Sequence, residues 1–209
     1  MELLKGIDVA NAINEKLIKE SADMGGRVPK LAIIRVGERP DDMSYERGAT
    51  KKMEKVGFAC ESFVFPETIE NEAFQKEFDT INDNPEIDGI LLLPKHLDEE
   101  AVVGRISPEK DLDGISPVNL AKVFAGDKTG FAPCTAEAVV EMLDFAGIDV
   151  TGKRVTVVGR SLVIGKPVSM LLLKKNATVT ICHTKTKDMK EECRRADILV
   201  AAAGVAKMI

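Results

Sequence analysis

The sequence has few aromatic residues and no excess of positive charge. It contains no tryptophan and one tyrosine, and aromatic residues account for 4% of its 209 residues. Such a chain has little with which to stack on nucleic-acid bases. The 29 lysines and arginines are outnumbered by 34 aspartates and glutamates, which gives a net charge of −5. We therefore expect neither nucleic acid nor an anionic membrane as a partner.

Long apolar runs and metal-binding cysteine patterns are also missing. The sequence has no run of about 18 apolar residues that could span a bilayer, and residues 1–6 lack the apolar core of a signal peptide. The four cysteines form no C-x-x-C pair and only two histidines accompany them, so we expect reduced thiols and no metal site. With 44% hydrophobic and 30% charged residues, the composition is typical of a globular, cytoplasmic enzyme or binding protein.

Strand-like and helix-like segments alternate along the chain. Short apolar or β-branched runs predict six buried strands, at 31–36, 63–65, 87–93, 154–158, 177–182 and 198–202. The segments between them have the apolar spacing of helices. In the first of these, Asp41 or Asp42 is expected to cap the helix and Gly57 to end it. This alternation predicts parallel sheets with helices on both faces.

A stretch rich in proline and glycine, 107–133, interrupts the alternation and predicts a junction between two domains. We place the domains at 1–134 and 135–209. Because the chain stops just past a predicted strand, the second domain is expected to be unusually small or incomplete at its carboxyl terminus.

The strongest local signal is a glycine turn at 158–167, where a predicted strand runs into Gly159 and a helix begins near Pro167. This arrangement points backbone N–H groups and a helix dipole at an anion. Five residues separate Gly159 from Gly165, so the spacing is not that of a phosphate-binding P-loop. Ser161 stands at the second glycine of a G-x-G-x-x-G motif, and Val163 replaces the last glycine of a nucleophile elbow. The turn alone leaves a nucleotide site and an ordinary strand–helix connection open.

The next predicted strand favours NADP over NAD as the nucleotide. NAD-selective sheets carry an acidic residue near the end of this strand, whereas here the hydroxyl of Thr184 and two lysines, Lys185 and Lys187, follow it. Together with Arg160, they could bind a 2′-phosphate. The two lysines could equally form a solvated surface, and His183 could be a packed, hydrogen-bonded residue to which we assign no chemistry.

Several sequence blocks occur together in a fixed order. They are KDLDGISPVN at 110–119, PCT at 133–135, GRS-x-x-x-GKP at 159–167 and ATVTICHT at 177–184, preceded by Val36-Gly37, Pro40 and Tyr45. In this order and spacing they resemble the methylenetetrahydrofolate dehydrogenase/cyclohydrolase family over essentially the whole chain. The resemblance implies two α/β domains with a cleft between them, the second a Rossmann-like doubly wound sheet, in a homodimer. It also implies oxidation of methylenetetrahydrofolate to the methenyl form with NADP, followed in most members by hydrolysis to formyltetrahydrofolate.

The resemblance assigns roles to six residues. Those matching the family's cofactor positions are Gly159, Arg160, Ser161 and Thr184. Asp113 matches the carboxylate that holds the pterin, and Tyr45 matches the tyrosine that stacks on the folate ring. Taken alone, Asp113 would be interpreted as a loop-capping residue beside Gly114, and Tyr45 as half-buried packing. The capping role is expected instead of Asp111.

Two positions depart from the family pattern. The hydrolytic lysine expected one helical turn after Tyr45 is replaced by Ala49, and the glutamine that tunes it is replaced by Leu93. The segment after Leu93 is also a few residues shorter than usual. Because hydrolysis needs proton transfer and hydride transfer does not, we expect dehydrogenase activity to persist and cyclohydrolase activity to be weak or absent.

Of three alternative functions, two remain open at this stage and the third is excluded. Lys51 or Lys52 could take over the proton transfer and leave the enzyme fully bifunctional. The chain could be a non-catalytic nucleotide-binding module that keeps the fold without turnover. A P-loop phosphohydrolase fails on the spacing of the glycine turn.

Overall fold

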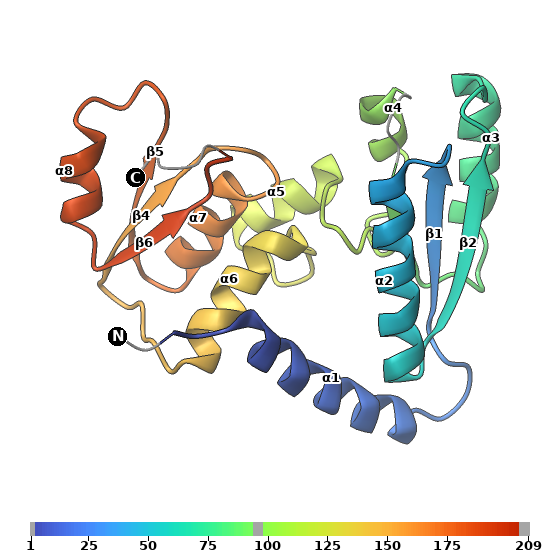
Figure 1. Cartoon of the computed structure of the whole chain (residues 1–209), viewed down its shortest axis with the longest axis horizontal. Helices are drawn as coiled ribbons and strands as arrows, with labels where there is room; N and C mark the ends of the chain where they lie inside the picture. The colour runs from blue at the N-terminus through green and yellow to red at the C-terminus, as the bar shows by residue number, and fades with distance from the viewer. Residues whose placement is uncertain (1–2, 94–97, 205–209) are drawn as a thin grey trace. The chain divides into compact units, whose positions relative to one another are not determined.

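The computed structural model describes residues 3–93 and 98–204, which form two compact units (Figure 1). One unit is Lys5–Pro117, and the other comprises the chain from Val118 onward together with the residues up to Leu4. The boundary predicted between residues 134 and 135, like the cleft expected between the domains, stays a prediction. Within the described residues, no helix is long and apolar enough to cross a membrane.

The first unit contains a parallel three-stranded sheet. Its strands are β1 (Lys30–Val36), β2 (Ala59–Phe65) and β3 (Gly89–Leu93), arranged in the order β2-β1-β3. The central strand β1 is buried at every position after its first residue, as expected for a strand covered on both faces. The three strands predicted in this part of the chain are confirmed, although β2 begins four residues earlier than 63–65 and β3 two residues later than 87–93.

Helices cover both faces of this sheet. The unit contains α1 (Gly6–Asp23), α2 (Pro40–Val56), α3 (Asn71–Asn82) and α4 (Glu99–Val103). Phe74 and Phe78 of α3 pack in a core cluster with Ile34 of β1. Residues Ala49 and Met53 of α2 pack against a second cluster that contains Ile33, the neighbouring position of β1. Because successive side chains of a strand point to opposite faces, α2 and α3 lie on opposite sides of the sheet.

The start of α2 differs from the expectation. The helix begins at Pro40, and Arg39 is its N-cap without a side-chain hydrogen bond. Neither Asp41 nor Asp42 is the cap, because the fixed φ of proline suits the first helical position and sets the N-cap at Arg39, two residues before Asp41. The predicted stop is confirmed, since Gly57 follows the helix with φ 81°.

The second unit repeats this architecture. Its parallel sheet contains β4 (Arg154–Val158), β5 (Thr178–Cys182) and β6 (Ile198–Ala201) in the order β5-β4-β6. Its helices are α5 (Pro117–Ala125), α6 (Cys134–Phe145), α7 (Gly165–Lys174) and α8 (Met189–Arg194).

Helices again lie on both faces of the sheet. Val155 and Val157 of β4 share a core cluster with α6 and α7. On the other face, the Thr156 hydroxyl donates to the carbonyl of Glu192 in α8, at 3.1 Å. The predicted fold class, two α/β units with parallel, doubly wound sheets, is confirmed.

Both sheets place their first strand in the centre, their second strand on one side and their third strand on the other. The chain therefore passes from the central strand to one side of the sheet and then crosses back to the other side, so the strand order reverses at the central strand. In open α/β sheets, ligands bind beyond the carboxyl end of the strands where the strand order reverses in this way. That position follows Val36 in the first unit and Val158 in the second.

Candidate cofactor and substrate sites

The glycine turn after β4 is held by close backbone packing. Gly159 has φ 136°, and its N–H donates to the carbonyl of Cys182 at 2.8 Å. A Cβ added at Gly159 would lie 2.4 Å from the carbonyl oxygen of Ala202, and one added at Gly165 would lie 2.2 Å from the carbonyl oxygen of Gly159. Both positions therefore require glycine, and the start of α7 lies directly against the end of β4, as in dinucleotide-binding folds.

Ser161 organises the start of α7. Its Oγ accepts hydrogen bonds from the backbone N–H groups of Ile164 at 3.1 Å and Gly165 at 3.4 Å, and its carbonyl accepts from Lys166 N–H at 3.0 Å. The hydroxyl oxygen is therefore used as an acceptor within the turn, whereas its hydrogen can be donated to an anion. A phosphate at this helix start would also interact favourably with the helix dipole.

Arg160 and Thr184 lie at the same edge of the sheet. Val158 and Cys182 are paired in register, so each of the two residues stands two positions beyond a paired strand end, and both are exposed. After β5, His183 N–H donates to the Thr186 hydroxyl at 2.8 Å, and the Nδ1 of His183 accepts from Lys185 N–H at 3.1 Å. The imidazole thus participates in closing the turn.

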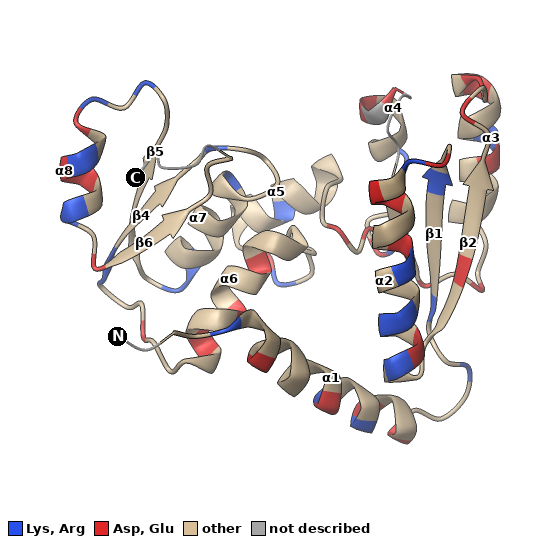
Figure 2. Ribbon diagram, in the orientation of Figure 1, with Lys and Arg blue, Asp and Glu red and all other residues tan. Residues whose placement is uncertain are grey.

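The residues at this edge fit NADP. Residues 183–187 include no acid, and Figure 2 shows basic residues in the loop between β5 and α8. An exposed guanidinium and a hydroxyl suit a 2′-phosphate, whereas an acidic residue would repel it. Of the cofactor residues predicted from the sequence, Gly159, Arg160 and Ser161 lie in the turn after β4, and Thr184 lies just beyond β5 at the same edge of the sheet.

In the first unit, Tyr45 lies on an open depression along α2. The depression is lined by Asp41, Ser44, Tyr45, Gly48, Ala49 and Lys52. Tyr45 itself is 55% exposed, more than expected of a half-buried packing residue. An exposed aromatic ring on a helix face is a suitable surface for stacking against a planar ligand.

The two departures from the family pattern meet in one apolar cluster. Ala49 and Leu93 both pack against a core of Leu31, Ile33 and Leu91 on the α2 side of the sheet. Ala49 also lines the open depression beside Tyr45, so a lysine at position 49 could extend into the depression and away from the cluster. The segment after Leu93, which is predicted to be shorter than usual, begins with residues 94–97, and these lie outside the described residues.

Lys52 is held by α1. Its Nζ donates to Oδ1 of Asn14 at 3.3 Å, and Asn14 is 5% exposed. The neighbouring Lys51 is exposed. The amine of Lys52 is therefore directed toward α1, although the residue also contributes to the depression beside Tyr45.

The loop that carries Asp113 is organised by Asp111. Asp111 is 1% exposed, and its carboxylate accepts hydrogen bonds from the N–H groups of Ile115 at 3.1 Å and Ser116 at 2.8 Å. The capping role predicted for Asp111 is confirmed. Asp113 lies within the turn that these bonds fix and is half-buried, and its role toward the pterin stays a prediction.

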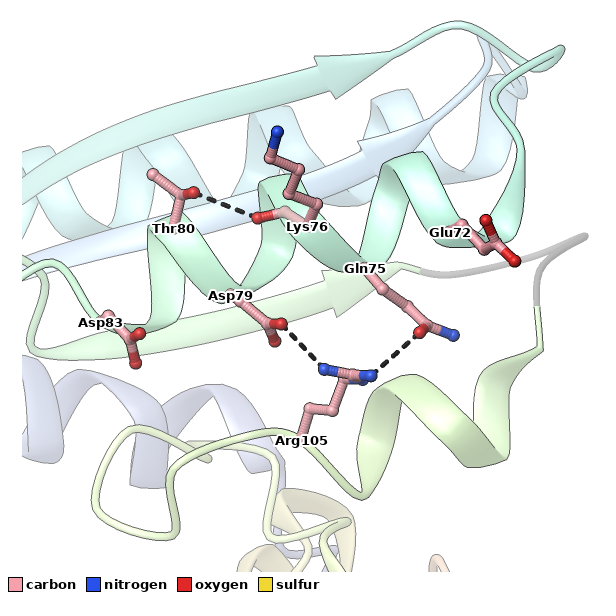
Figure 3. A pocket seen from close by; sticks show the side chains of 7 residues that line it. All are labelled: Glu72, Gln75, Lys76, Asp79, Thr80, Asp83 and Arg105. Atoms are coloured by element: carbon pink, nitrogen blue, oxygen red, sulfur yellow. Dashed lines mark hydrogen bonds and ion pairs between the residues drawn. The ribbon is translucent and has the colours of Figure 1, made fainter.

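A second hollow, on α3, is lined by charged and polar residues, among which Arg105 pairs with Asp79 (Figure 3). Arg105, just beyond α4, donates to Asp79 Oδ2 at 2.8 Å and to Gln75 Oε1 at 3.0 Å. These bonds hold the chain after α4 against α3, so the hollow has a structural explanation. Among the described residues, no group of three histidines, cysteines, aspartates or glutamates could hold a metal ion.

The sequence-based interpretation missed a buried ion pair beneath α2. Arg35 of β1 forms an ion pair with Glu46 of α2, and its Nε lies 2.6 Å from Oε2 of Glu46. The sequence signal for this pair is Arg35, the one charged residue in the otherwise apolar run 31–36. A charged side chain in a buried strand needs a partner of opposite charge.

The fold and these two sites define a two-domain α/β protein whose second unit has the dinucleotide-binding form. Comparison with known proteins specifies the family. The profile described as "Tetrahydrofolate dehydrogenase/cyclohydrolase, catalytic domain" matches residues 4–113, and the one described as "Tetrahydrofolate dehydrogenase/cyclohydrolase, NAD(P)-binding domain" matches residues 133–209. The chain belongs to the tetrahydrofolate dehydrogenase/cyclohydrolase family.

Relatives and solved structures agree with this assignment. The chain is 50% identical over 214 positions to the "Bifunctional protein FolD" of Clostridioides difficile, covering 100% of this chain and 74% of that protein. That alignment is longer than the 209 residues of this chain, so the relative carries residues with no counterpart here.

Two crystal structures have the same fold. The FolD methylenetetrahydrofolate dehydrogenase/cyclohydrolase of Campylobacter jejuni matches with a TM-score of 0.95 at 32% identity, covering 100% of this chain and 76% of that one. The Trypanosoma brucei enzyme, solved with NADP cofactor and an inhibitor, matches with a TM-score of 0.89 at 36% identity, covering 98% and 72%.

Proposed function

We propose that this chain oxidises methylenetetrahydrofolate to methenyltetrahydrofolate with NADP, as a dehydrogenase of one-carbon metabolism. The observation that carries the proposal is the gathering of Arg160, Ser161 and Thr184 around the turn after β4, in a chain of this family. A hydride leaves the methylene carbon, the folate becomes a cation, and no proton has to be transferred in this step.

NADP, when bound, supplies the acceptor of that hydride. The chain's own residues bind and orient the two reactants. The exposed guanidinium of Arg160 and the hydroxyl of Thr184 bind the 2′-phosphate, and Ser161 with the start of α7 binds the pyrophosphate. On the folate side, Asp113 accepts hydrogen bonds from the N–H groups of the pterin edge, and Tyr45 stacks on the aromatic ring. Holding both reactants in register lowers the barrier without a proton-transfer group.

We further propose that cyclohydrolase activity is weak or absent. Hydrolysis of the methenyl group needs an activated water and a group that moves protons, and the side chains of Ala49 and Leu93, packed against an apolar cluster, can do neither. The fully bifunctional alternative relies on Lys51 or Lys52. The bond from Lys52 to Asn14 argues against Lys52 in that role.

A cofactor-resolved assay with purified protein tests these proposals. Incubation with methylenetetrahydrofolate should produce NADPH from NADP faster than NADH from NAD, while added methenyltetrahydrofolate should disappear no faster than in buffer. Tight NADP binding without reduction would instead support the non-catalytic nucleotide-binding module. Accelerated loss of the methenyl form would support full bifunctionality.

Restoring a lysine gives a sharper test of the cyclohydrolase proposal. Ala49→Lys should raise the rate of methenyltetrahydrofolate hydrolysis by about tenfold or more, because a positioned acid–base group contributes at least that much. Lys51→Ala, which removes the exposed neighbouring lysine, is the matched control and should leave hydrolysis unchanged. Substantial hydrolysis by the unaltered chain that is lost in Lys51→Ala would contradict the proposal.

The working form of the protein is proposed to be a cytoplasmic homodimer. The dimer follows from the family resemblance, and the cytoplasmic setting is supported by the four cysteines, Cys60, Cys134, Cys182 and Cys193, none of which forms a disulfide. Sedimentation or light scattering of the purified chain measures the oligomeric state directly.

A further inference from the structure

A charged pair is buried beneath the helix that carries Tyr45. Arg35 is 8% exposed in β1, and its Nε lies 2.6 Å from Oε2 of Glu46 in α2. The two side chains are 10% and 15% exposed. Glu46 directly follows Tyr45 in the sequence, so the pair ties the sheet to the same helical turn that presents the tyrosine.

The guanidinium has a second attachment in the connection from β1 to α2. Nη1 of Arg35 donates a hydrogen bond to the carbonyl of Gly37. Gly37 adopts φ 73°, and its own N–H donates to the carbonyl of Phe65 in β2 at 2.9 Å. One planar side chain therefore fixes a strand, the turn that follows it and the first half of the next helix, with bonds whose directions are set by the guanidinium fork.

This attachment lies where the fold of the first unit places a ligand. Arg35 is the penultimate residue of the central strand and pairs in register with Leu93 of β3. The strand order reverses at this strand, and its carboxyl edge is the binding position in doubly wound sheets. On the α2 side of the sheet, Ile33 packs in the apolar cluster with Ala49. Arg35, two residues nearer this edge, forms the ion pair with Glu46.

The environment of Glu46 favours its charged form. Burial would raise the pKa of Glu46, but hydrogen bonds from Ser62 and Arg35 and the charges of Arg35 and Arg47 outweigh it and hold that pKa below its usual value. A buried ion pair contributes little net stability compared with apolar side chains of similar size, although it fixes geometry. The pair is thus better explained by what it positions than by stabilisation of the fold.

We propose that Arg35 and Glu46 are positioning residues for the folate substrate, which hold the Tyr45 turn of α2 and the Gly37 turn in the arrangement that the substrate requires. This inference rests on the proposed function. The pair belongs to the first unit, whereas the nucleotide residues all belong to the second. Its loss should therefore affect the folate and not NADP.

A double variant separates positioning from stability. Arg35→Met with Glu46→Leu removes both charges and keeps apolar bulk, so the protein should fold with an unchanged or higher Tm. The KM for methylenetetrahydrofolate should nevertheless rise by about tenfold, because small displacements of a binding surface weaken productive binding. Both kcat at saturating folate and the KM for NADP should stay within about twofold of their original values.

The matched control removes an ion pair at the other end of β1. Lys30 of β1 and Glu61 of β2 lie 2.9 Å apart, and Lys30→Met with Glu61→Leu should leave the KM for methylenetetrahydrofolate unchanged. Arg35→Lys provides a second test. It keeps the positive charge but loses the planar set of guanidinium donors, and it should also raise the KM for methylenetetrahydrofolate.

Tyr45 offers a direct structural readout, because it is the only tyrosine in the chain. Labelling tyrosine rings gives NMR signals from this residue alone, and they should shift in the Arg35/Glu46 double variant and not in the Lys30/Glu61 control. An unchanged KM for methylenetetrahydrofolate in both the double variant and Arg35→Lys would overturn the inference, even if the unaltered enzyme turns over normally. Absence of turnover in the unaltered enzyme would instead overturn the proposed function, and the inference with it.

Discussion

At the scale of single residues, Asp113 and Asp111 allow binding to be separated from structure. Asp113→Asn should raise the KM for methylenetetrahydrofolate by about tenfold or more, because an amide cannot accept two charge-assisted hydrogen bonds from the pterin edge. Steady-state kinetics at saturating NADP measures this change, with the KM for NADP expected to stay constant. An unchanged folate KM would contradict the role of Asp113.

Asp111→Asn is the contrasting variant for that experiment. The carboxylate of Asp111 accepts from two backbone N–H groups within a buried turn, so its substitution should lower the free energy of unfolding. The loss is expected to be about 1–3 kcal/mol, measured by urea denaturation. If both substitutions lowered the free energy of unfolding equally, Asp113 would also stabilise the conformation of the loop.

Arg160 is the residue on which the choice of nucleotide depends most directly. Arg160→Gln removes the positive charge next to the expected 2′-phosphate and should weaken NADP binding by about tenfold or more. Binding of NAD, which lacks that phosphate, should change little. Titration calorimetry with both nucleotides measures the ratio of the Kd for NADP to the Kd for NAD. Arg154→Gln, at the opposite end of β4, is the control and should leave this ratio unchanged.

At the scale of elements, Asp88, the residue before β3, binds the connection from α1 to β1. The carboxylate accepts from Arg27 at 2.7 and 2.8 Å and from Lys30 N–H at 2.7 Å. The hydrogen bond from Arg27 is the main cause of a lowered Asp88 pKa, with burial opposing it and the Lys30 bond adding to it. Asp88 thus stabilises the folded state when ionised.

This arrangement predicts a dependence of stability on pH. Because the pKa of Asp88 is lower in the folded state than in the unfolded chain, its contribution is complete above the unfolded value of about 4 and is lost as pH falls through the folded value. Asp88→Asn should therefore be less stable than the original protein at pH 7, and the difference should shrink below about pH 4. Chemical denaturation across this range measures it. Glu20→Gln, at an exposed helical pair with Lys16, should show no such trend.

The elements also show what the sequence alone could predict. The bounds of β4 agree exactly with the apolar run at 154–158, and the αL conformation of Gly57 agrees with the predicted end of α2, since both signals are local. The predicted start of α2 was wrong because both proline and aspartate are favoured at helix starts, and here Pro40 sets the first position. The Arg35–Glu46 pair was missed because the two residues lie eleven positions apart, and only the packing of α2 on β1 reveals that they meet.

At the scale of the whole molecule, the two units divide the proposed work between them. Hydrogen exchange read by mass spectrometry should show slower exchange at 159–166 and 183–186 when NADP is added, because binding suppresses local opening. The amides of α3 in the first unit should exchange at an unchanged rate. Protection confined to residues 5–117 would contradict the assignment of the nucleotide to the second unit.

The crowding at Gly159 and Gly165 has a consequence for mutational scans of this protein. Any side chain at either position would collide with backbone atoms, Ala202 O in one case and Gly159 O in the other, whether or not a nucleotide is present. Intolerance to substitution there would therefore report on chain packing alone. The side chains of Arg160 and Thr184 are exposed, so substitutions there should disturb the fold little. Selection for activity at these two positions would therefore report on nucleotide binding.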